Sequence, residues 1–136
     1  MPSSMVSYRG TADGLAPSRR LLHILTMSDI KHAKFAIGQV VRHRLYPFRG
    51  LIFDIDPVFA NTEEWWLSIP EEVRPRKDQP YYHLYAENAE TTYLAYVSEQ
   101  NLLLDEDQKP LRHPDIEDHF IVDGNGGYRL RPEVSN

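Results

Sequence analysis

The feature that most constrains the fold of this chain is a series of short segments in which apolar and polar residues alternate, each closed by turn residues. In LIFDID, at 51–56, the period is two, which is typical of a strand with one face towards a core and the other partly in solvent. The turn residues YPFRG at 46–50 precede this strand, and Pro57 ends it. A first strand is therefore predicted before the turn, within 34–45.

The aromatic segments 81–88 and 91–102 predict two more strands, joined as a hairpin by a short turn. Residues 98–101 predict one helical turn, and a last short strand follows at 102–104. Four or five short strands in about seventy residues predict a mostly β fold, a small barrel whose closure removes exposed strand edges. Residues 61–80 (the insert) then lie between strands two and three and contain a helix.

The insert holds the only two tryptophans of the chain, Trp65 and Trp66, among glutamates and prolines. Asn61 or Thr62 is suited to cap a helix that starts here, and Pro70 stops it. Adjacent residues on a helix diverge by about 100°, so the two indoles are not expected to be equally buried. We predict that one closes the open end of the barrel core and that the other lies at the surface as a contact site.

The two ends of the chain differ from its middle in composition. Residues 1–32 are small, polar and rich in structure breakers, which predicts a disordered extension, and Met27 opens an alternative start. Paired arginines before an apolar run also resemble a twin-arginine export signal, but this run is short and lacks a small-residue cleavage site. Residues 33–105 are predicted as the folded domain, and 106–136 as a polar tail in which 113–122 can form a short helix.

The charge balance limits the kinds of partner. The chain carries 15 Lys and Arg against 20 Asp and Glu, a net charge of −5. Because affinity for nucleic acid rests largely on cations that meet phosphates, this balance argues against tight non-specific DNA binding and leaves a local basic patch or a protein partner. There are no cysteines, which excludes disulfides and thiolate chemistry, and no apolar run is long enough to span a membrane.

No set of residues predicts an enzyme or a metal site. Asp54 and Asp56 share a strand face, which would allow a carboxylate pair, but a solvated face is the simpler interpretation. Segment 113–119 contains histidines and carboxylates without the spacing of a helical ligand pair, so we interpret it as part of the polar tail. His83 lies between tyrosines and is interpreted as a half-buried, hydrogen-bonded histidine, with a ligand contact as the alternative. We expect no catalytic residue, metal or cofactor.

Basic and aromatic residues instead predict a binding surface for DNA or for a protein. Arg42 and Arg44 alternate along one strand and point the same way. Guanidinium groups beside aromatic rings suit phosphate contact and base stacking, and they also suit protein hot spots. The simpler alternative is that both arginines pair with Asp54 and Asp56 on the neighbouring strand. The candidate binding residues are Arg42, Arg44, Tyr46, Phe48, Arg49, Trp65, Trp66, Arg74, Arg76 and Lys77.

Four blocks of sequence resemble the bacterial heat shock protein family HspQ, also called the YccV-like or hemimethylated DNA-binding domain family. They are GQVVRH at 38–43, RGLIFDIDP at 49–57, YYHLYAEN at 81–88 and AYVSEQNL at 95–102. The resemblance covers about residues 33–105, and it implies a small SH3-like barrel in the bacterial cytoplasm. The long charged insert and the N-terminal extension depart from the family pattern, and no catalytic residue is carried over.

The resemblance also implies a function. It implies binding of hemimethylated DNA, including at the replication origin, restraint of the initiator DnaA, and a role in stress-responsive proteolysis as a specificity enhancer of the Lon protease. We expect DNA binding first; the alternative is a protein-binding adaptor for Lon or its clients, which the acidic balance favours. If methylation is read, it is through apolar contact with a methyl group in the major groove, for which Tyr46 and Phe48 are suited although nothing in the sequence requires it. Short edge strands and an exposed aromatic residue make homo-oligomers a further expectation.

Overall fold

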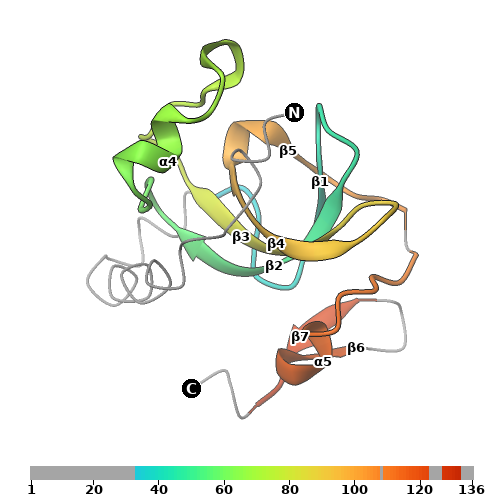
Figure 1. The fold of residues 1–136 in the computed structure, drawn as a ribbon. Coiled ribbons are helices and arrows are strands. Elements are labelled where there is room, and N and C mark those ends of the chain that lie inside the picture. The colour runs from blue at the N-terminus through green and yellow to red at the C-terminus, as the bar shows by residue number, and fades with distance from the viewer. Residues whose placement is uncertain (1–32, 108, 123–126, 133–136) are drawn as a thin grey trace.

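The computed structural model describes residues 33–107, 109–122 and 127–132, so the expected disorder of 1–32 lies outside the described residues. The strands are β1 Val40–His43, β2 Arg49–Asp56, β3 Tyr81–Glu87, β4 Thr92–Ser98, β5 Leu102–Leu104, β6 Phe120–Val122 and β7 Tyr128–Leu130. The first five form one antiparallel sheet in the order β4-β3-β2-β1-β5, and β6 and β7 form a second, two-stranded sheet (Figure 1). The mostly β fold is thus confirmed.

Short helical segments connect the strands. They are α4 Glu63–Leu67, the 3-10 turns η1 Glu71–Val73 and η2 Glu99–Asn101, and α5 Ile116–His119. Within the part of the chain that the structure describes, no helix has the length and apolar character needed to cross a membrane.

The five-stranded sheet curves strongly but does not close into the predicted barrel. β1 pairs with both β2 and β5, whereas β4 pairs with β3 alone, so β4 and β5 are the two edges within the described residues. The register between β2 and β3 shifts between Ile52 and Asp54, and such a bulge increases local twist and bends the sheet. The predicted hairpin is present as the antiparallel pair of β3 and β4, and the closed SH3-like barrel is not observed.

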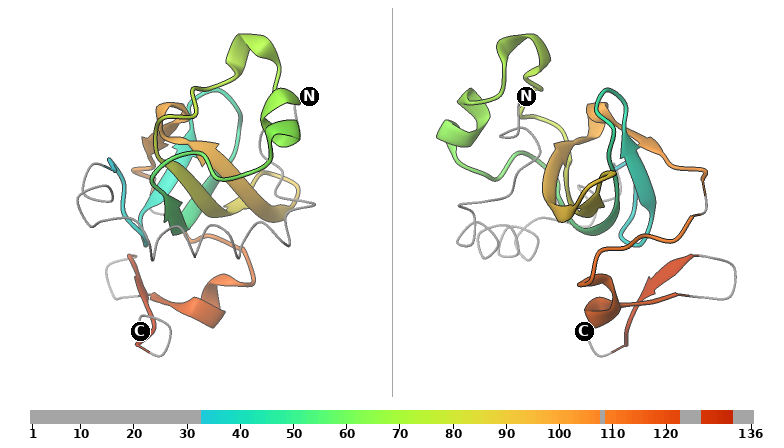
Figure 2. Two further views of the ribbon diagram at one scale, coloured as in Figure 1. Left: turned by 90° about the vertical axis from the view of Figure 1, so that its left-hand side faces the viewer. Right: turned by 45° about the vertical axis from the view of Figure 1, so that its right-hand side comes forward.

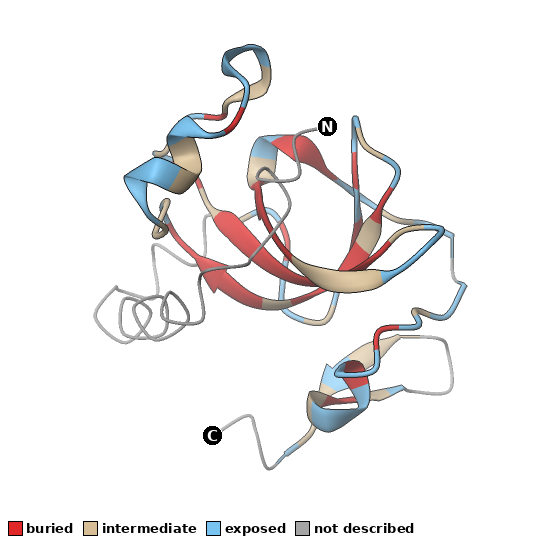
Figure 3. Cartoon of the chain, in the orientation of Figure 1, coloured by how far each residue is buried: buried red, intermediate tan, exposed pale blue. Residues whose placement is uncertain are grey.

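The concave face of the sheet encloses the main core, and Figure 3 shows the buried strands that line it. Side chains alternate inwards along β3 and β4, as the period-two pattern predicted. In β2 the register shift places Ile52 and Ile55 in the same core, so strict alternation fails there. Gly50 allows β2 and β3 to approach closely here, because a Cβ at this position would lie 2.8 Å from the carbonyl oxygen of Tyr85. The core residues are Phe35, Val41, Phe48, Ile52, Ile55, Ile69, Tyr82, Leu84, Ala86, Ala95, Val97 and Leu102.

The other face of the sheet is also covered, which contradicts the predicted solvated face of β2. Asp54 and Asp56 are only 2% and 0% exposed. The phenol of Tyr96 donates to Asp56 Oδ2 at 2.8 Å, and His83 Nε2 lies 3.0 Å from the same oxygen. The carboxylate of Asp56 is therefore held inside a polar cluster. This also confirms the interpretation of His83 as a hydrogen-bonded histidine, although it is fully buried rather than half-buried.

The insert forms the predicted helix, and Thr62 caps it. The N–H of Trp65 donates to Thr62 Oγ1 at 3.0 Å. The prediction of one buried and one exposed tryptophan is wrong, because Trp65 and Trp66 are both half-buried. Trp65 packs edge-on against Tyr96 with ring centroids 5.4 Å apart, while Trp66 is enclosed by the loop that follows the helix and donates from Nε1 to the carbonyl oxygen of Pro75 at 2.9 Å.

Residues 109–122 and 127–132 are folded, although a polar tail was expected there. Ile116 and Phe120 pack on Leu51 and Tyr85 of the sheet in a second apolar cluster. The phenol of Tyr85 also lies 3.0 Å from Nδ1 of His119. The predicted short helix is confirmed as α5. Figure 2 shows that this C-terminal segment and the insert lie at opposite ends of the sheet. The division of the chain at residue 105 stays a prediction.

Candidate nucleic-acid interface

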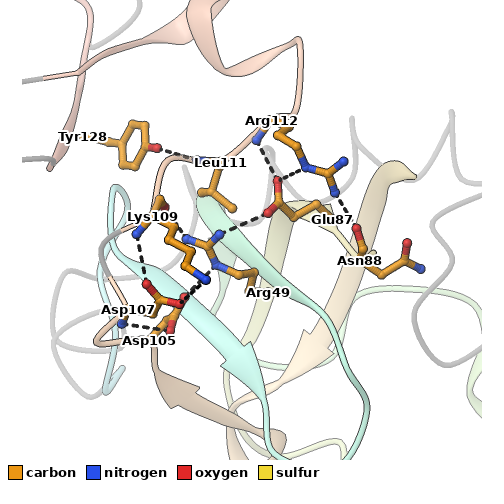
Figure 4. A network of polar contacts seen from close by, with 9 residues as sticks. All are labelled: Arg49, Glu87, Asn88, Asp105, Asp107, Lys109, Leu111, Arg112 and Tyr128. Atoms are coloured by element: carbon orange, nitrogen blue, oxygen red, sulfur yellow. Dashed lines mark hydrogen bonds and ion pairs between the residues drawn. The ribbon is translucent and has the colours of Figure 1, made fainter. Parts of the chain in front are cut away.

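Arg49, one of the predicted binding residues, is the centre of an ion-pair network. Its Nη1 donates to Glu87 Oε2 at 3.0 Å, and its Nε donates to Asp105 Oδ2 at 2.7 Å (Figure 4). Its Nη2 donates to the carbonyl oxygen of Lys109. Arg112 joins the network by donating its backbone N–H to Glu87 Oε1 at 2.6 Å. Arg49 therefore holds the segment after β5 against the sheet, and its charge is already matched by two carboxylates.

Arg74 and Lys77 are likewise used inside the insert. The guanidinium of Arg74 donates to the carbonyl oxygens of Leu67 and Ile69, which lie at or just beyond the end of α4, and it lies 5.0 Å from the Trp66 ring centroid. The ammonium of Lys77 lies 4.5 Å from the same ring. The two cations thus sit against the indole, and cation–π contacts of this kind stabilise a folded loop. Lys77 also forms an ion pair with a carboxylate of α4, that of Glu63.

Arg76 has a different position. Its Nε donates to Asp78 Oδ1 at 3.0 Å in a fully solvent-exposed pair, which is worth little to stability. Its carbonyl oxygen accepts from Gln79 Nε2 at 3.0 Å, and the same nitrogen donates to Gln100 Oε1 at 2.6 Å. Since Arg44 Nε donates to the carbonyl oxygen of Gln100 at 2.9 Å, this chain of hydrogen bonds connects the insert to the end of β1.

Arg42 and Arg44 are exposed, and neither forms an ion pair with any described residue. The predicted alternative, pairing with Asp54 and Asp56, is wrong because both aspartates are buried. Arg42 lies opposite Arg49 on one side and opposite Leu103 on the other. This part of the β1–β5 edge therefore carries two uncompensated positive charges.

The turn after β1 is fixed by a buried histidine. The backbone N–H groups of Leu45 and Tyr46 both donate to His43 Nδ1 at 3.0 Å. The imidazole lies between the rings of Tyr46 and Phe48, at centroid distances of 4.8 and 5.1 Å. Burial, assisted by the charge of Arg44, lowers the pKa of His43 from 6.5 to about 4. The neutral ring with its hydrogen on Nε2 is therefore the form that holds the turn.

The predicted aromatic contacts differ in accessibility. Phe48 is 6% exposed and belongs to the main core, so its side chain does not reach the surface to stack on a base. Tyr46 is half-buried against the same core. The burial of Phe48 was not evident from its position in a turn between basic residues, because the core partners that cover it, His43 and Tyr93, come from β1 and β4.

Acidic residues border the arginine edge. Asp105 is engaged by Arg49, and Asp107 Oδ2 lies 3.8 Å from the ammonium of Lys109. A shallow hollow is lined by Arg42, Leu103, Leu104 and residues 105–107. Glu106 has no ion-pair partner among the described residues, so its negative charge opposes the positive potential of Arg42 here.

The histidines of the expected polar tail contact Tyr85, a member of the second apolar cluster. The ring of His113 lies tilted against that of Tyr85, with centroids 4.9 Å apart, and burial lowers the pKa of His113. Across 33–107, 109–122 and 127–132, no group of three or more histidine and carboxylate side chains is arranged to hold a metal ion.

Sequence reasoning missed the surface role of β5. Leu103 and Leu104 are 42% and 48% exposed, although LLL at 102–104 is typical of a buried strand. Only the register with β1 distinguishes Leu102, which is buried, from its two exposed neighbours. No signal within the three-residue segment itself could have separated them.

Comparison with known proteins agrees with the sequence blocks. The family model described as "Hemimethylated DNA-binding protein YccV like" matches residues 33–126, well over half of the chain. No solved structure gives a significant match. The matched range includes the five-stranded sheet, the insert, and α5 and β6. The family is one of DNA-binding domains, not of enzymes. The chain therefore belongs to the YccV-like family of hemimethylated DNA-binding proteins.

Proposed function

We propose that this protein binds duplex DNA through the β1–β5 edge, with Arg42 and Arg44 as the phosphate-contacting residues. The observation that carries the proposal is that these two exposed arginines, one on β1 and one directly after it, lack carboxylate partners among the described residues. Arg49, Arg74 and Lys77, by contrast, have their charges engaged within the fold. Membership of the YccV-like family supports DNA as the ligand.

Such a surface suits a modest affinity for DNA that decreases gradually as the salt concentration rises. Two phosphate contacts release few counterions, so the slope of log K against log salt should be shallow, about −0.9 for each contact. The net charge of −5 further limits non-specific binding. The chain therefore depends on a specific feature of the DNA more than a strongly basic protein does.

Fluorescence anisotropy with labelled duplexes at several salt concentrations tests the proposal on the full chain. Arg42→Ala and Arg44→Ala should each weaken binding and reduce the salt slope by about 1. Arg129→Ala is the matched control, because Arg129 is an exposed arginine on β7, outside the proposed surface. Equal losses in all three variants, or no binding by the unmodified protein at low salt, would refute the proposed interface.

A second candidate function is supported by a different surface. The insert exposes Leu67, at 52%, beside exposed glutamates of α4 and η1. An exposed apolar residue on an element that also carries exposed carboxylates suits a basic protein partner. This favours an adaptor role for the insert, and the specific role that we propose is enhancement of proteolysis by Lon. DNA binding through Arg42 and Arg44 would instead serve to restrain the initiator DnaA.

The adaptor role has its own assay. Degradation of a purified client by purified Lon is measured with and without the full chain. Leu67→Ala should abolish any stimulation, while Arg42→Ala should leave it unchanged. Absence of stimulation by the unmodified protein would remove this candidate and leave DNA binding untouched.

A further inference from the structure

The sheet register places Leu103 beside both exposed arginines. Leu103 lies directly opposite Arg42, so the two side chains share a face with Cβ atoms about 5 Å apart. The backbone N–H of Arg44 donates to the carbonyl oxygen of Asn101 at 3.0 Å, which extends the β1–β5 pairing by one residue beyond His43. Leu103 is therefore the direct neighbour of one guanidinium and the diagonal neighbour of the other.

Core packing does not explain the exposure of this leucine. Leu102, one residue earlier, is 2% exposed and fills the main core, whereas Leu103 turns outwards at 42% exposure. Arg44 beside it is held in place because its Nε donates to the carbonyl oxygen of Gln100. An apolar side chain is thus presented beside two cations, directly opposite Arg42 and diagonal to Arg44, and a backbone carbonyl holds Arg44.

We propose that Leu103 contacts the methyl group of a methylated base in the major groove, while Arg42 and Arg44 contact the flanking phosphates or base edges. The inference rests on the proposed function. Methyl groups in the major groove are recognised by apolar contact, and backbone phosphates by guanidinium groups. The arrangement of one exposed leucine beside two arginines supplies both kinds of contact on a single face.

Other apolar residues near the arginines meet these requirements less well. Phe48, which the sequence favoured, is a core residue. Leu104 is 48% exposed, but it lies opposite Val41, whose side chain faces the core, so it projects from the other face of the strand. Tyr46 is half-buried against His43. Leu103 is the apolar side chain that shares its face with both arginines.

The experiment measures the dissociation constants of the full chain for unmethylated and hemimethylated duplexes of one sequence. The expected preference for the methylated duplex is about fourfold, since burial of one methyl group is worth ~0.8 kcal/mol and tenfold corresponds to ~1.36 kcal/mol. Leu103→Ala should reduce this ratio towards one and leave the affinity for the unmethylated duplex within about twofold. Leu67→Ala, an equally exposed leucine on α4, is the control and should keep the ratio.

The outcomes separate this inference from the proposed function. If the protein binds both duplexes and Leu103→Ala leaves the ratio unchanged, or if no preference for the methylated duplex exists, the assignment of Leu103 is wrong while DNA binding stands. If no duplex is bound at all, both are wrong. If Leu103→Ala weakens both duplexes equally, the residue supports the edge without contacting the methyl group, and the inference is overturned. Circular dichroism confirms that each variant is folded.

Discussion

The pH dependence of stability should be governed in part by His43, which holds the turn between β1 and β2. Its Nδ1 accepts two backbone N–H bonds, from Leu45 and Tyr46, so protonation of that nitrogen would break both. In the folded protein, burial lowers the pKa of His43 from its ordinary value of 6.5 to about 4. Between these two values the unfolded chain binds a proton at His43 that the folded chain does not, and stability therefore falls as the pH is lowered through this window.

The size of the effect follows from the pKa difference. From 6.5 down to about 4, at ~1.36 kcal/mol per unit, the loss is at most about 3 kcal/mol. This is a large share of the 5–15 kcal/mol that typically stabilises a domain. The contribution is fully present above pH 6.5 and is lost as the pH approaches 4.

The assay is urea denaturation from pH 8 to pH 4, followed by tryptophan fluorescence, for the unmodified protein and for His43→Asn. An asparagine Oδ1 can accept the same two N–H bonds but does not titrate. The variant loses ring contacts with Tyr46 and Phe48 at every pH, so only the difference in pH dependence is diagnostic. Titration of the carboxylates and of His113 changes the stability of both proteins in the same way, so it cancels in the difference between them. Parallel curves for the two proteins over this range would refute the reasoning.

Three further perturbations have expected outcomes. Arg49→Ala should lower the free energy of unfolding by about 3 kcal/mol, because it leaves the nearly buried carboxylate of Asp105 without a cation and leaves Glu87 with the guanidinium of Arg112 alone; a loss below 1 kcal/mol in urea denaturation would contradict this. Tyr96→Phe should cost about 1–2 kcal/mol, since its hydroxyl donates to Asp56 and accepts from the N–H of Ala60, and an unchanged unfolding midpoint would argue that the cluster is not stabilising. Glu106→Gln should raise the affinity for DNA about twofold at low salt. At ~1 M salt the affinity should be unchanged, because electrostatic interactions there extend only about 3 Å. If fluorescence anisotropy shows no gain at low salt, the DNA does not lie near residue 106.

The strands were predictable because period-two patterning and turn residues are local signals. The segments 51–56 and 81–88 were identified as strands on that basis, and the structure confirms both. Which side of each strand is buried was not predictable in the same way. The bulge between Ile52 and Asp54 shifts the register of β2 against β3, and an isolated sequence pattern carries no information about which later segments will cover a face.

The candidate site was predictable only in part. Arg42 and Arg44 were identified from their alternation along one strand, and the structure leaves both exposed. The roles of Arg49 and Arg74 depend on carboxylates and carbonyl groups that lie elsewhere in the folded chain, such as Asp105 and Ile69. Half-burial of the two tryptophans also depends on distant residues, because the loop after α4 supplies the cations that cover Trp66 and β4 supplies the Tyr96 ring that packs on Trp65.

The brevity of β5 has a consequence for motion. Three residues pair with β1, and no strand pairs with the outer side of β5 in the described part of the chain, so this edge should open locally at a lower free energy than the β2–β3–β4 meander. Leu103 would leave its place beside Arg42 while the rest of the sheet remains intact. Amide hydrogen exchange should then be fastest in β5 among the five strands, and a bound duplex should slow exchange there first. Ligand binding would thus be coupled to the closing of a strand.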